Sequence, residues 1–292
     1  MPRYARRMGL FLDSFWRAAA YCLHPRVIAL SFLPLVIMVT LSLVAGYFFW
    51  HPAVESLRMA LEASDWMRTF SGWLSGMGAR GFVNVIPELI IIFAATPVIV
   101  LLSLLVVAAL MAPVLTALVA LRRFPDLERK RGGSVLASVA WAAGSTLLAM
   151  VALVVSLPLW LIPPLVLVLP PLIWGWLTYR VMAFDALATH ASREERRAIF
   201  LRHRGWLLGI GVLTGYLGAA PSVLWASGAL FAAAFIVLIP LAIWIYTLVF
   251  AFSSLWFAHF CLAALAQMRA QAEPPLAPQP SPAAPDGNAI EY

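Results

Sequence analysis

The sequence predicts an all-α integral membrane protein with about six hydrophobic helices, some of them possible half-spanning hairpins, plus amphipathic helices at the membrane interface. Apolar residues make up 63% of the chain and charged residues only 11%, against roughly 25% charged residues in an ordinary soluble domain. A spanning helix needs about 20 apolar residues, and uncharged runs of at least that length occur at 27–50, 89–121, 132–179 and 205–268. Such runs indicate a polytopic membrane domain over residues 25–268.

The N-terminal segment, residues 1–24, is predicted to be a cytosolic amphipathic helix. Its large apolar residues share one helical stripe and its charged residues lie opposite, a pattern typical of a helix in the headgroup plane. The stripe consists of Met8, Phe11, Leu12, Phe15, Trp16 and Ala19. Residues 53–78 show a second pattern of this kind, with Trp66, Phe70 and Trp73 at helical spacing.

The four uncharged runs provide the six hydrophobic helices. The first run holds one span, and the second holds one long span that Pro97 can kink. The third breaks near 157–164 into segments at 135–157 and 165–180, and the fourth breaks around 221–228. Short proline-bearing turns fit either full spans or hairpins that dip into the membrane and return. The Pro- and Ala-rich tail, residues 269–292, is predicted to be disordered and cytosolic.

The distribution of Lys and Arg predicts the orientation. With six crossings, the N-terminal segment, the 122–131 loop, the 180–204 loop and the tail fall on one side of the membrane. Together they carry seventeen Lys and Arg residues, whereas Arg58, Arg68 and Arg80 fall on the other side. Because cytoplasmic loops are enriched in Lys and Arg, we expect both termini to be cytosolic in a multi-pass protein.

Several function classes have no support in the sequence. The basic residues form short clusters between apolar runs, which fits lipid headgroups better than nucleic acid. Cys22 and Cys261 lie far apart and suggest neither a disulfide framework nor a metal cluster. No catalytic or phosphate-cradling motif is present. We therefore expect no enzymatic activity, no cofactor, no metal ion and no nucleic-acid partner; the expected partners are the lipid bilayer and a small solute.

The fifth hydrophobic segment is rich in glycine and follows a basic stretch. Its glycines, at positions 205, 209, 211, 215 and 218, favour close packing of helices. A second interpretation is that a helix starts at Gly205. The backbone amides of its first turn would then bind an anion together with Arg202 and Arg204.

An ordered series of motifs resembles the CysZ sulfate-permease branch of the etoposide-induced protein family. The opening pattern comprises Phe15, Ala20, His24-Pro25 and Pro34-Leu35. It is followed by Ala112-Pro113 and then by Arg202, Arg204-Gly205-Trp206, Gly209, Gly211 and Pro221. The resemblance covers roughly residues 10–265 in order and spacing. It implies a bacterial inner-membrane protein with full spans and two shorter hairpins, passage of sulfate, and assembly into a homo-oligomer.

One departure from the family pattern concerns anion binding. In the sulfate-permease branch two arginines follow the first proline at three and four residues and are associated with sulfate binding, whereas this chain has Ile28 and Ala29 there. The nearby cations are His24 and Arg26, which we include with Arg202, Arg204 and Gly205 as anion-binding candidates. The leading prediction is passage of a small inorganic anion, sulfate by resemblance, without an evident coupling ion. The alternative is a non-transporting membrane protein that binds lipid or partner subunits.

Overall fold

The computed structural model describes residues 2–78, 81, 84–226 and 228–272, and this part of the chain is helical with no strand. The helices are α1 (Pro2–Cys22), α2 (Pro25–Ser31), α3 (Leu33–Glu62), α4 (Asp65–Gly76), α6 (Ile86–Arg123), α7 (Val135–Ser156), the 3₁₀ helix η1 (Leu157–Leu161), α8 (Pro163–Ala188), α9 (Arg193–Ala226) and α10 (Gly228–Ala272). The predicted all-α membrane fold is confirmed.

Five helical stretches of the described residues are long and apolar enough to cross a membrane: Pro25–Glu62, Ile86–Arg123, Leu136–Leu161, Pro163–Ala188 and Pro240–Ala272. The remaining expected segment, the glycine-rich fifth in chain order, is the second half of α9, which continues without interruption from a charged first half. The breaks predicted at 157–164 and near 228 occur where η1 separates α7 from α8 and where α10 begins.

Two predicted boundaries differ from the structure. The segment expected to end at 180 continues as α8 to Ala188, so Arg180 and Asp185 belong to the same helix as the apolar segment before them. Likewise α10 continues to Ala272, four residues into the range expected as a tail. The remainder of that predicted tail, residues 273–292, lies outside the described residues.

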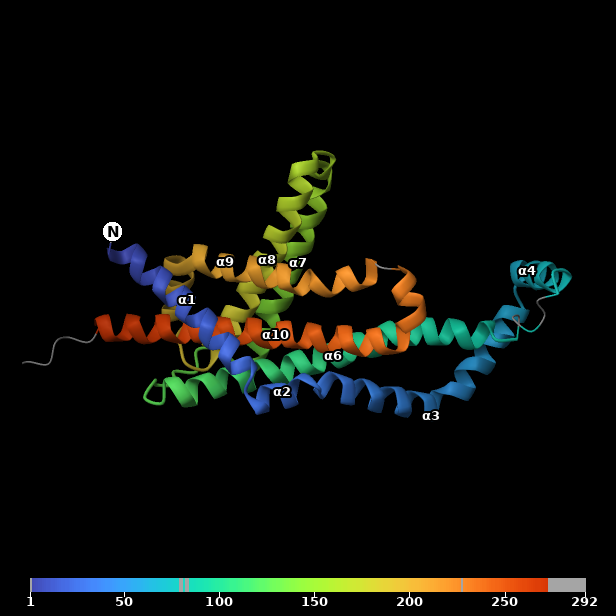
Figure 1. Cartoon of the computed structure of the whole chain (residues 1–292), viewed down its shortest axis with the longest axis horizontal. Coiled ribbons are helices and arrows are strands. Elements are labelled where there is room, and N and C mark those ends of the chain that lie inside the picture. Colours follow the sequence, from blue (N-terminus) through green and yellow to red (C-terminus); the bar gives the residue numbers. More distant parts are fainter. Residues whose placement is uncertain (1, 79–80, 82–83, 227, 273–292) are drawn as a thin grey trace, which may run out of the picture.

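The core is built around α10. In its apolar stretch, 78% of the residues are buried inside the protein, against 11–17% in the other four spans. α3, α6 and α9 extend alongside α10, and the α7–α8 hairpin stands crosswise to them (Figure 1). The fully buried large side chains come mostly from α10: Leu255, Trp256, Phe257, His259, Phe260, Leu262 and Leu265. Because lipid is as apolar as these side chains, close packing and polar contacts, more than removal from water, hold such a core together.

One part of the apolar stripe of α1 packs against the rest of the protein, and the other part is exposed. Phe11 and Phe15 pack on the Trp256 ring of α10, with ring centroids 5.1 and 5.0 Å apart. Met8, Leu12 and Trp16, which the sequence places on the same stripe, remain exposed. α1 is therefore a helix docked across α10 that presents a second apolar edge outward, and not one whose whole stripe faces lipid.

Candidate functional site

The basic segments meet at one end of the molecule, where α6 and α10 end (Figure 1). The Arg269 guanidinium of α10 forms a two-pronged ion pair with the Glu195 carboxylate, at 3.0 and 2.9 Å. Lys130 Nζ also contacts Glu195, at 3.0 Å. The Glu195 carboxylate accepts from the Ser192 backbone N–H at 2.8 Å, and the Ser192 hydroxyl accepts from the Glu195 N–H. This reciprocal pair is a capping box at the start of α9. Glu195 thus joins a helix start, a loop and the end of α10.

The loop before α7 is held against the end of α8 by backbone hydrogen bonds. The N–H groups of Lys130, Arg131, Gly132 and Gly133 donate to carbonyls of residues 188–191. These bonds hold Arg131 at φ +46°, a left-handed conformation that residues other than glycine seldom adopt. At Gly132 the chain passes so close to the Ala191 carbonyl that a Cβ would overlap it. The loop therefore stores local strain at an arginine, a feature that occurs preferentially at functional positions.

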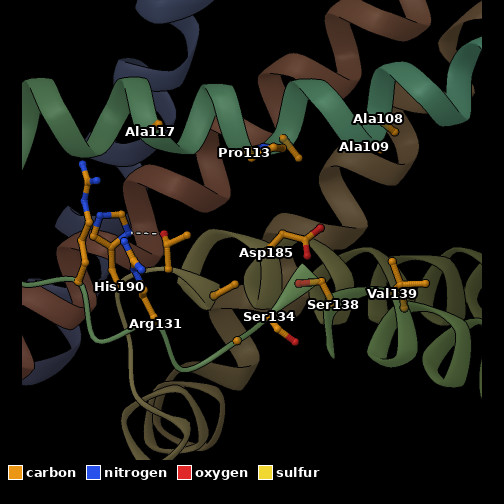
Figure 2. Close-up of a pocket in the computed structure, with 16 residues that line it drawn as sticks. Ala108, Ala109, Pro113, Ala117, Arg131, Ser134, Ser138, Val139, Asp185 and His190 are labelled. Carbon is orange, nitrogen blue, oxygen red and sulfur yellow. Dashed lines mark hydrogen bonds between the residues drawn. The ribbon is translucent and has the colours of Figure 1, made fainter. Parts of the chain in front are cut away.

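A cavity of about 420 Å³ lies beneath this loop, between α6, α7 and the end of α8. Arg131 and His190 lie on one side of it, and Ser138 of α7 and Asp185 of α8 lie away from them, toward Val139 (Figure 2). Arg129 also lines the cavity. The wall that α6 contributes is small and apolar: Ala108, Ala109, Ala112, Pro113 and Ala117. The cavity is thus cationic at the loop and apolar along α6.

The charges around the cavity are only partly compensated. Among the described residues, neither Arg129 nor Arg131 makes a hydrogen bond or an ion pair through its side chain, and both side chains are exposed. The start of α7 borders the cavity, with the Ser134 hydroxyl accepting from the Ala137 N–H at 3.1 Å. A helix N-terminus carries partial positive charge. The mouth of the cavity therefore offers guanidinium donors and a helix dipole to an anion.

His190 does not add a full charge at neutral pH. Burial, with repulsion from Arg129 and Arg269, holds the pKa of its imidazole below the ordinary value of 6.5. The imidazole Nδ1 lies 2.7 Å from the Thr189 hydroxyl. His190 is therefore a neutral polar group at the mouth.

Asp185 places an acidic side chain in the cavity, whereas the loop contributes basic ones. It lines the cavity together with Ser138, and in its ionised form it repels an entering anion. An anion would thus be held near Arg129 and Arg131 and not at the inner end of the cavity. The sequence prediction missed Asp185 because the charge at Arg180 was taken as the end of the span, although apolar residues continue from 181 to 187 around it.

A second cavity, also of about 420 Å³, lies deeper between α6, α8, α9 and α10, and Ala108 borders both cavities. Its hydroxyl groups include Thr178, Thr214 and Thr247, each of which donates to a backbone carbonyl of its own helix. With their protons engaged, these hydroxyls offer mainly acceptor lone pairs. These three hydroxyls therefore do not supply donors to an anion in this cavity, and Tyr246 adds one further hydroxyl to its lining.

None of the five predicted anion-binding residues is among the described residues that line the cavity under the loop. His24 caps α2 through its Nδ1, which accepts from the Arg26 N–H at 3.2 Å. Arg202 and Arg204 lie on α9, where Arg202 contacts Gln271 at 3.4 Å. Their predicted role stays a prediction, and the structure places them on different elements from Arg129 and Arg131.

The helix start predicted at Gly205 is wrong. α9 begins at Arg193, so Gly205 lies inside a continuous helix whose N–H groups are already engaged. The packing interpretation of the glycines holds at Gly211, where a Cβ would overlap the Gly175 carbonyl of α8. Gly205, Gly209, Gly215 and Gly218 have open space where a Cβ would be.

A comparison with protein families gives one match. The model of the family described as sulfate transporter CysZ/etoposide-induced protein 2.4 matches residues 14–227. No curated protein and no solved structure matches the chain.

Proposed function

We propose, since this chain belongs to the sulfate transporter CysZ/etoposide-induced protein 2.4 family, that it passes a small inorganic anion across a bacterial inner membrane, with sulfate as the leading solute. The observation that carries this proposal is the pair of unengaged guanidinium groups, Arg129 and Arg131, at the mouth of a cavity within a multi-pass membrane protein. Charge-assisted hydrogen bonds from guanidinium groups suit oxyanions, because the planar fork of donors matches two oxygens at once.

The arrangement supports recruitment at the loop followed by release into a hydrated interior. Arg129 and Arg131 attract the anion, and the positive end of α7 adds to that attraction. Repulsion from Asp185 limits how tightly the anion can settle, and a pore needs binding weak enough for the ion to leave. No coupling ion is required by this scheme. The lipid bilayer and the anion are the proposed partners, and a homo-oligomer remains a proposal by family resemblance.

A second candidate function is favoured by the exposed apolar edge of α1. Met8, Leu12 and Trp16 present an apolar face on a helix that also carries Arg17, which suits lipid or a partner subunit without transport. Flux of radiolabelled sulfate into proteoliposomes separates the two functions. We expect flux above that of empty vesicles, with saturation only at high sulfate concentration, because Ile28 and Ala29 replace the family's arginine pair. Flux equal to empty vesicles, where a working family member gives a signal, would favour the second function.

We also propose that the end of the molecule carrying Glu195 and Arg269 is cytosolic, on the basis of the Lys and Arg distribution. In a background lacking Cys22 and Cys261, single cysteines at Ala63 and Ala198, both exposed positions, should differ in labelling by a membrane-impermeant thiol reagent. In intact cells the cysteine at 63 should react, and the cysteine at 198 should react only after the membrane is opened. The reverse pattern would overturn the orientation.

A further inference from the structure

Arg180 lies inside an apolar helix and has no acidic partner. It is eight residues from the end of α8 at Ala188, roughly 12 Å along the helix. In the described residues no carboxylate forms an ion pair with it, and its Nε contacts only the Ser145 hydroxyl of α7, at 3.4 Å. Charged side chains within membrane-spanning segments are costly and usually serve a function.

Two tryptophan rings hold the guanidinium of Arg180. Its Cζ lies 4.0 Å from the ring centroid of Trp141 and 5.0 Å from that of Trp176. The Trp141 indole N–H donates to the Arg180 carbonyl at 3.0 Å, which fixes the ring against the helix. Cation–π contact of this kind orients a guanidinium and stabilises it in part. It does not satisfy the N–H donors at the edge of the group.

The stack continues toward the loop that carries the cavity mouth. The Trp141 ring lies on Phe184 with centroids 5.3 Å apart, and the Arg196 guanidinium lies 4.2 Å from the Phe184 centroid. Arg196 in turn donates to the Gly132 carbonyl at 3.4 Å. Arg180 is therefore held in place by a series of ring contacts that reach the loop through Arg196.

The terminal nitrogens of Arg180 remain open. A guanidinium has five N–H donors, and in the described part of the chain only the Nε donor of Arg180 is engaged. The residue is half-buried, and its two terminal nitrogens carry the other four donors. In an apolar surrounding, donors of this kind need an acceptor with negative charge.

We propose that the terminal nitrogens of Arg180 bind a tetrahedral oxyanion group, with Trp141 and Trp176 fixing the plane of the guanidinium. The group has two sources with the same chemistry, namely a phospholipid phosphate or a free oxyanion such as sulfate. This site is separate from the cavity mouth, because Arg180 is not among the residues that line the cavity. The inference does not depend on whether the protein moves an anion across the membrane.

The test uses full-length protein with Arg129 and Arg131 replaced by Gln, so that the cavity mouth does not contribute. Within this background, Arg180→Lys keeps the charge and loses the fork, Arg180→Met removes the charge, and Arg197→Met removes one charge from an exposed position on α9. The first measurement is calorimetric titration with sodium sulfate in phospholipid-free detergent, with sodium chloride at equal ionic strength as reference. The second is native mass spectrometry after extraction from vesicles of phosphatidylglycerol and a phosphate-free glycolipid.

If the ligand is a free oxyanion, we expect sulfate binding to weaken about tenfold or more in Arg180→Lys, because one charge-assisted hydrogen bond is lost. Sulfate binding should disappear in Arg180→Met. A lipid phosphate predicts one retained phosphatidylglycerol that is lost from both Arg180 variants. In each case Arg197→Met should behave as the parent protein does. Identical behaviour of the parent and Arg180→Lys in both measurements would overturn the proposal, even if Arg180→Met fails to fold.

Discussion

Replacing Arg131 by glycine should lower sulfate flux by about tenfold while leaving the melting temperature unchanged or slightly raised. The lost guanidinium removes a charge-assisted contact, worth on the order of 1.5–3 kcal/mol, at the cavity mouth. The backbone, by contrast, is relieved, because Arg131 is held at φ +46° and a left-handed conformation costs an L-residue roughly 1–2 kcal/mol. Glycine adopts that conformation freely but loses about 0.5–1 kcal/mol of chain entropy on ordering. We therefore expect the substitution to lower the sulfate flux without lowering the melting temperature.

The matched control is Arg131→Lys, which keeps both the positive charge and the strained backbone. It should retain most of the flux, reduced only by loss of the planar fork, and should not raise the melting temperature. Flux in proteoliposomes and thermal unfolding in detergent are the two measurements. Full flux in Arg131→Gly would remove Arg131 from the proposed site and leave the strained loop as a purely structural feature.

Replacing Glu195 by glutamine should lower the free energy of unfolding by about 2 kcal/mol, a larger loss than we expect for any of the other substitutions. Glutamine still completes the capping box with Ser192, so the substitution isolates the ion pairs. It leaves Arg269, whose side chain is 19% exposed, and Lys130 without their shared carboxylate. Removing one partner of a fully buried pair costs 3–5 kcal/mol, and partial exposure reduces that value here. A loss of about 2 kcal/mol corresponds to a melting temperature lowered by roughly 5 °C.

The pH dependence of the same contact can be tested independently. Hydrogen bonds from Arg269, helped by Ser192 and Lys130, lower the pKa of the Glu195 carboxyl from 4.5 to about 2. A depressed carboxyl pKa stabilises the folded state fully above the unfolded value and loses that effect as the pH falls through the folded value. The difference in melting temperature between the native protein and Glu195→Gln should thus be constant above pH 4.5 and shrink toward pH 2.

Glu194→Gln is the control for both measurements. Its carboxylate contacts only the Ser192 hydroxyl, at 2.8 Å, and is fully exposed, so its substitution should change the melting temperature by less than about 2 °C, since surface changes remain within roughly 0.5 kcal/mol. Equal losses in Glu194→Gln and Glu195→Gln would show that capping, and not the link to α10, stabilises this end of the protein.

Composition and the uncharged runs predicted the fold class because a bilayer imposes length and polarity on each helix separately. Proline also marked the break between α7 and α8, where Pro163 lies in the first turn of α8. The break expected from Pro221 onward begins only after Ala226, because α9 continues through Pro221. The ends of helices were harder to predict. A rule that stops a span at the first charge ended the third run at Arg180 and missed the last eight residues of α8.

The site could not be predicted because it depends on contacts between distant segments. Arg129 and Arg131 were counted only for their charge, and their relation to Asp185 and the α6 wall follows from how α8 meets the loop. Gly205 was placed at a helix start because glycine after a basic stretch looks like a boundary, yet α9 passes through it as one helix. Helical propensity of the residues on both sides outweighs a single glycine, which costs about 1 kcal/mol.

Because α1 docks on α10, it can reach its native position only after α10 has been synthesised. Phe15 of α1 meets its partners on α10, Trp256 and Phe252, only after some 240 further residues have left the ribosome, a wait of roughly 10–50 s at ordinary elongation rates. Until then α1 lacks its partners on α10, although Phe11 also packs on Trp206 of α9, and the helices that precede α10 lack their central packing partner. Because most of the largest fully buried side chains belong to α10, a nascent chain stopped before α10 has membrane helices but lacks the main part of the native core.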